Sequence, residues 1–71
     1  MRRLVAANKI LIGGKCEVRL GVVEIEGRDV VGVKRLHGEQ PFTEWLGGTI
    51  QISTAQGGER HAFKDGIMLI A

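Results

Sequence analysis

Two histidines, one cysteine and two carboxylates are the side chains of this 71-residue sequence best placed to do chemistry. They are His37, His61, Cys16, Glu39 and Glu44. A hydrolytic or structural metal ion needs three or four donors, and they usually come from short motifs such as His-x-His or Cys-x-x-Cys. No such motif occurs, so the sequence predicts no catalytic residue, no metal site and no cofactor.

A second chemical candidate is Gly13-Gly14-Lys15, which follows an apolar strand-like segment. Exposed amides of a glycine-rich loop and a lysine can hold a phosphate when the loop opens a helix. The residues that follow, 16–20, alternate as in a strand instead, which predicts a hairpin turn. This alternation directs Cys16, Val18 and Leu20 inward, where a thiol acts as a small hydrophobe and not as a nucleophile.

The elements that carry these residues are strands, because the hydrophobic pattern has a period of two and is punctuated by glycines. A turn at Gly27-Arg28-Asp29 makes residues 22–36 a hairpin, and Asp65-Gly66 is typical of a type I′ hairpin turn. The expected strands are 3–12, bent or divided at Asn8-Lys9, then 16–20, 22–26, 30–36, 49–53, 60–64 and 67–70. We expect an all-β single domain over 1–71, a small β-sandwich or partly open barrel of six to seven short, mostly antiparallel strands.

Residues 37–48 interrupt the alternation and form the longest irregular segment. They contain the one proline, Pro41, which could open a single helical turn, and two of the three aromatic residues, Phe42 and Trp45. These aromatic side chains either fold the segment onto the sheet or contact a partner subunit, since aromatics contribute large contact areas.

The composition is that of a globular protein, with 44% hydrophobic and 25% charged residues and a net charge of +2. Acidic and basic residues are mixed along the chain, which indicates no particular partner class. No apolar run is long enough for a membrane span, and the one near the start breaks at Asn8-Lys9, so we expect no membrane association and no secretory signal. An unpaired Cys16 then favours a cytoplasmic location.

A chain of 71 residues buries only about 60% of its unfolded surface, so its own core stabilises it weakly. No disulfide or metal supplements that core, and the final strand is apolar on both faces, a hazard at a free sheet edge. This predicts a homo-oligomer, most simply a dimer, with another protein as a further possible partner. The interface candidates are Phe42, Trp45, Leu46, Ile67, Met68, Leu69 and Ile70.

One family resemblance covers about two-thirds of the chain. It consists of a first strand and loop, then 21–28 (GVVEIEGR) and 30–33 (VVGV), and finally Gly47-Gly48-Thr49-Ile50. This order resembles the N-terminal β-sandwich segment of metal-dependent amidohydrolases, which lies beside their catalytic barrel. The family continues through Pro-Gly into a His-x-His metal pair, whereas residues 49–53 have neither. The resemblance therefore implies an accessory, non-catalytic sandwich module without the barrel.

The alternative function is binding of single-stranded nucleic acid, because small β-barrels do this with a basic groove and aromatic platforms. Basic and aromatic candidates are present, but aromatics are only 4% of the chain and each basic strand has acidic neighbours. We therefore expect no nucleic-acid partner. The candidates are Arg2, Arg3, Lys9, Lys34 and Arg35 for charge, and Phe42, Trp45 and Phe63 for stacking.

Overall fold

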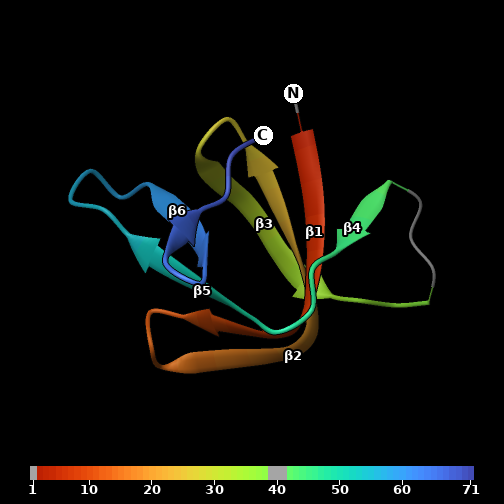
Figure 1. Ribbon diagram of the computed structural model, residues 1–71. Helices are drawn as coiled ribbons and strands as arrows, with labels where there is room; N and C mark the ends of the chain where they lie inside the picture. The colour runs from red at the N-terminus through yellow and green to blue at the C-terminus, as the bar shows by residue number, and fades with distance from the viewer. Residues whose placement is uncertain (1, 39–41) are drawn as a thin grey trace.

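The computed structural model describes residues 2–38 and 42–71, and these form one mixed sheet of seven strands in the order β3-β2-β1-β5-β6-β7, with β4 also paired to β1 (Figure 1). The all-β prediction is confirmed, and the sheet curls without closing. The strands are β1 (Arg2–Ile12), β2 (Cys16–Glu26), β3 (Asp29–Arg35), β4 (Thr43–Trp45), β5 (Thr49–Thr54), β6 (Arg60–Lys64) and β7 (Ile67–Met68). The described residues contain no helix capable of crossing a bilayer. Pro41, which was expected to open a helical turn, falls outside the described residues, but residues 43–45, where that turn would continue, form β4.

The first hairpin, β1 and β2, bends in both strands at the same level. Before the bend the inward residues of β1 include Val5 and Ala7, and after it Ile10, so two successive residues between them point outward. The β1–β2 register nevertheless stays constant from Arg2 opposite Glu26 to Ile12 opposite Cys16. The strands therefore turn together, and of the two forms expected for 3–12 the single bent strand is confirmed.

The bend allows β1 to pair with two further strands on one edge. Leu4 to Ala6 pair with β4 and Lys9 to Ile12 pair with β5, both in parallel. At the junction the amide of Gly48 donates to Asn8 Oδ1 at 2.8 Å, and the amide of Lys9 donates to the Gly48 carbonyl at 3.1 Å. The Asn8 side chain thus accepts a hydrogen bond between the end of the β1–β4 pairing and the start of the β1–β5 pairing.

The open side of the sheet is bridged between the β2–β3 turn and the last two strands (Figure 1). The amide of Ala71 donates to the carbonyl of Gly27 at 2.8 Å. His61 Nδ1 lies 2.8 Å from the carbonyl oxygen of Arg28, so this ring nitrogen carries the donated proton. These contacts join segments more than 30 residues apart.

The core lies on the concave side of the curled sheet, and residues from both halves of the bent hairpin contribute to it. Leu46 and Leu69 are partly buried and pack against it. Its buried members are Val5, Ala7, Ile10, Val23, Ile25, Val30, Ile50, Ile52 and Ala62.

Local turn chemistry agrees with the sequence. Asp65 and Gly66 both have positive φ, 52° and 80°, as a type I′ turn requires, and β6 pairs with β7 across them. Gly13 and Gly14 also have positive φ and connect β1 to β2. The hairpin turn expected at Gly13-Gly14-Lys15 is therefore confirmed.

Three sequence-based expectations are corrected. Cys16 and Leu20 were expected to point inward, but both are exposed. The bend shifts the alternation so that Leu20 faces outward, whereas Cys16 is exposed because it begins β2 beside the exposed β1–β2 turn. The irregular segment 37–48 contains a strand, β4. The strand expected at 67–70 is shorter, with a ladder of only Ile67–Met68 at the sheet edge.

We predict that Asn8→Ala lowers the free energy of unfolding by about 0.5–1.5 kcal/mol, because the amide of Gly48 loses its acceptor. Asn8→Asp keeps an acceptor oxygen and should lose less. Urea denaturation of wild type and both variants measures the free energies of unfolding. Equal losses of stability in the two variants would show that the hydrogen bond from the Gly48 amide to Asn8 Oδ1 does not stabilise the fold.

We predict that Gly21→Ala costs about 1–3 kcal/mol, because a Cβ there would collide with the buried Ile10 side chain and lie 3.1 Å from Val18 Cγ1. The matched control is Gly32→Ala, whose Cβ would meet mainly the mobile end of Glu24, at 3.3 Å from Oε2. Thermal unfolding of both variants checks this, and a control as unstable as Gly21→Ala would refute the packing argument.

Candidate functional site

A second buried apolar cluster lies on the outer face of the sheet, away from the core. Ala6 and Val22 are each 1% exposed, yet neither belongs to the core cluster that contains their neighbours Val5 and Val23. Since successive residues of a strand point to opposite faces, Ala6 and Val22 face outward. Their burial means that surrounding side chains cover this part of the outer face.

The strand register identifies those neighbours. Across the sheet, Trp45 of β4 pairs with Ala6, Ala6 pairs with Val22, and Val22 pairs with Lys34 of β3. On the same face Leu4 lies two residues from Ala6, and Leu20 two residues from Val22. We call the apolar members the outer patch: Leu4, Ala6, Leu20, Val22, Trp45, and Leu36, whose amide donates to the Leu20 carbonyl at 2.7 Å.

Trp45 is the largest side chain of the outer patch and remains 55% exposed. Its indole lies against the β4–β5 connection, where a Cβ on Gly47 would be 3.5 Å from Nε1. Gly47 has a φ of +70° and no side chain, which leaves room for the ring. The ring is therefore positioned by backbone while much of its surface faces solvent.

Two exposed apolar residues adopt backbone conformations that cost energy. Leu20 has a φ of +49° and is 51% exposed, and Phe42 has a φ of +64° and is 94% exposed. A non-glycine residue in the left-handed region costs about 1–2 kcal/mol, and only Gly, Asn or Asp occupy it readily. The side chains of Leu20 and Phe42 offset little of that cost by burial within the monomer.

Arg3 connects β4 to the C-terminal segment. Its guanidinium donates from Nε and Nη2 to the two carboxylate oxygens of Glu44, both at 3.0 Å, and from Nη1 to the Ile70 carbonyl at 3.1 Å. The hydrogen bonds from Arg3 hold the pKa of Glu44 below its ordinary value, and the same contacts raise the pKa of Arg3. The two segments expected to form an interface are thus linked within the monomer.

The interface candidates divide into exposed and inward-packed residues. Leu46 and Leu69 pack against the core, so we assign them to folding. Met68 is half-buried at the edge strand β7. The remaining four are exposed: Phe42 and Trp45 as given above, Ile67 at 70% and Ile70 at 53%.

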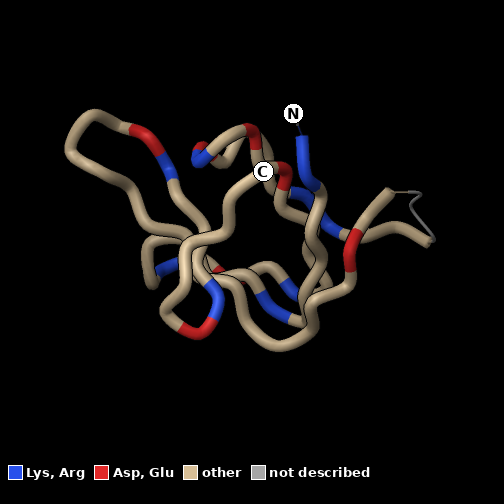
Figure 2. The backbone as a smooth tube through the Cα atoms, turned by 45° about the horizontal axis from the view of Figure 1, so that its top comes forward, with Lys and Arg blue, Asp and Glu red and all other residues tan. Residues whose placement is uncertain are grey.

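Positions with acidic and basic residues are interspersed along the backbone (Figure 2). Of the basic residues considered for nucleic acid, Arg2 contacts Glu24 and Glu26, Arg3 contacts Glu44, and Lys9 contacts Glu17. In the described part of the chain, Lys34 and Arg35 take part in no such ion pair. Phe63, the third aromatic candidate, is half-buried on β6.

The residues considered for metal binding lie apart. Residues 2–38 and 42–71 contain no group of three His, Cys, Asp or Glu side chains able to hold an ion. His37 is exposed beyond β3, His61 donates to a backbone carbonyl and Glu44 is held by Arg3. Glu39 falls outside the described residues.

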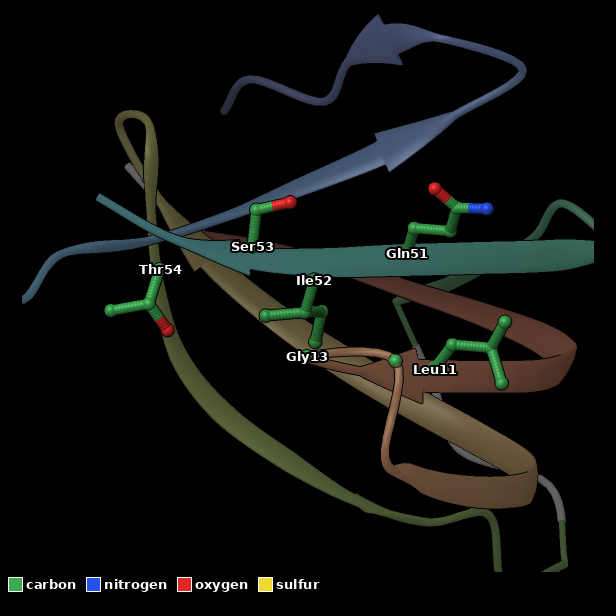
Figure 3. Close-up of a pocket in the computed structure, with 7 residues that line it drawn as sticks. Leu11, Gly13, Gln51, Ile52, Ser53 and Thr54 are labelled. Atoms are coloured by element: carbon green, nitrogen blue, oxygen red, sulfur yellow. The ribbon is translucent and has the colours of Figure 1, made fainter.

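A shallow cavity of about 390 Å³ lies between the β1–β2 turn and the end of β5 (Figure 3). Gln51 and Ser53 point to the same side of β5, and Leu11 lies beside them on β1. None of the lining side chains is ionisable, so the cavity offers no side-chain acid or base for catalysis. The lining residues are Leu11, Gly13, Gly14, Gln51, Ile52, Ser53 and Thr54.

Comparison with known proteins returns no match to any family, curated protein or solved structure. Assignment of a function therefore depends on the surface itself. Sequence reasoning identified Trp45 but missed the rest of the outer patch, because Leu20 was expected to face the core. The sequence feature that could have predicted the outward direction of Leu20 is the pair of polar residues Asn8-Lys9 on β1, which marks the bend opposite Leu20.

We predict that the Arg3–Glu44 pair stabilises the fold at neutral pH and that this contribution is lost in acid. The folded pKa of Glu44 lies below its ordinary value of 4.5, so the stabilisation is fully present above that value and disappears as the pH falls through the lower, folded pKa. The difference in melting temperature between wild type and Glu44→Gln should therefore shrink from about pH 6 to about pH 3.

Glu59→Gln is the control, because Glu59 takes part in no ion pair among the described residues and its melting-temperature difference should change less over that range. A difference for Glu44→Gln that stayed constant down to the lowest pH would mean that the carboxylate contributes nothing through its charge.

Proposed function

We propose that this chain is a non-catalytic protein-interaction domain that self-associates, most simply as a dimer, through the outer patch. The observation that carries the proposal is Leu20. It combines an exposed apolar side chain with a strained backbone, a combination that destabilises the monomer and becomes favourable when a partner covers the side chain. Trp45, beside it on the same face, has the size and exposure of an interface anchor.

The total exposed area supports the same proposal. The folded chain exposes 4755 Å², whereas a monomer of 7.7 kDa is expected to expose roughly 4,300 Å². The excess of about a tenth accords with a surface that lacks its partner. Small domains without disulfides or metals commonly gain the missing stability by association.

The proposed role is that of an accessory module in the cytoplasm, in keeping with the sequence resemblance to the β-sandwich of amidohydrolases and with a single exposed cysteine, Cys16. A non-catalytic role is supported by the separation of His37, His61, Cys16 and Glu44 described above. The ion pairs of Arg2, Arg3 and Lys9 place a carboxylate beside three of the five basic candidates, which disfavours binding of a phosphate backbone there.

We predict that Trp45→Ser raises the dimer dissociation constant at least about tenfold, because the substitution removes the largest apolar contact of the outer patch. Ile67→Ser is the matched control, since Ile67 is also large, apolar and exposed. It lies on the edge strand β7, which is separated from β1 by β5 and β6. Sedimentation equilibrium across a dilution series measures both.

Monomers of wild type at every concentration would contradict self-association. A dimer weakened by Ile67→Ser but not by Trp45→Ser would place the interface at the edge strand β7 and contradict the role of the outer patch. Circular dichroism confirms that both variants remain folded.

A further inference from the structure

We infer that the partner of the outer patch is a second copy of this chain, related by a two-fold axis that runs parallel to β1 and β2, so that Trp45 of each copy lies on Lys34 of the other. This inference rests on the proposed function and specifies its geometry. It follows from the order of four side chains across the sheet.

These four side chains form one row on the outer face: Trp45, Ala6, Val22 and Lys34. Adjacent strands are about 4.8 Å apart, so the ends of the row are separated by roughly 14 Å. The two central residues are apolar but only 1% exposed, so this apolar centre is covered mainly by the neighbouring side chains. An aromatic ring stands at one end and a cation at the other, and both are exposed.

This order makes the row complementary to itself in one orientation. An axis along the strands, between β1 and β2, reverses the row in the second copy and places Trp45 over Lys34 and Ala6 over Val22. An axis along the row would instead place Lys34 over Lys34, where like charges repel.

The contact at each end of the row is favourable for both residues. An ammonium over a tryptophan face is attracted by the ring quadrupole, and the attraction increases when water is excluded. Lys34 is available for it, because it takes part in no ion pair of the described residues and lies on the edge strand β3. A two-fold axis forms this contact twice, on either side of the apolar centre.

The experiment compares Lys34→Glu with Arg35→Glu, which makes the same charge change at the next residue of β3, on the opposite side of the strand. Lys34→Arg retains a cation. Sedimentation equilibrium gives the dissociation constants. Fluorescence gives a second readout, because Trp45 is the only tryptophan and the chain has no tyrosine, so its emission should shift to the blue as the dimer forms.

We expect Lys34→Glu to raise the dissociation constant at least about tenfold, Arg35→Glu less than about threefold, and Lys34→Arg to resemble wild type. A dimer that responds equally to both glutamate substitutions, or that forms without a blue shift of Trp45, would overturn this arrangement while leaving self-association intact. A wild-type chain that stays monomeric up to about 1 mM would overturn the proposed function as well.

Discussion

The concerted bend of β1 and β2 is the constraint on which the rest of the structure depends. A flat hairpin of this length would bury one face only, whereas the bent hairpin contributes Val5 and Val23 to the core from one half and Ile10 from the other. Two outward residues in succession on β1, Asn8 and Lys9, change which positions face inward. The bend thereby lets residues 2–38 and 42–71, among which there is no helix, surround a core.

The bend also determines how later strands are used. β4 and β5 are separated by only Leu46 to Gly48, yet both pair with β1, one on each side of the bend. Asn8 makes this junction possible by accepting from the amide of Gly48. Because β4 occupies the edge beside Ala6, the chain places Trp45 on the outer face at the end of a short apolar row.

The features of Leu20 that we propose for binding a partner also destabilise the monomer. Leu20 stands at the bend, where its backbone is strained, and its side chain is exposed on the outer patch. Most nearby charges are neutralised by partners, as Arg2 and Glu24 show, so the face is apolar with a single cation, Lys34, on its row. In the dimer that we propose, the second copy presents the same pattern in reverse order.

The sequence by itself determined the all-β class, the positions of most strands and the hairpin turns, because alternation and the backbone preferences of residues such as Asp65-Gly66 act over a few residues. It also indicated a bend or break at Asn8-Lys9, and the structure shows the bend. The tertiary structure alone decided that Leu20 faces outward, that residues 43–45 form a strand, and that Ile67–Met68 lies at an edge. Each of these depends on pairing between distant segments: β4 is too short to form a strand without β1, and the direction of Leu20 reverses only because β1 and β2 bend together.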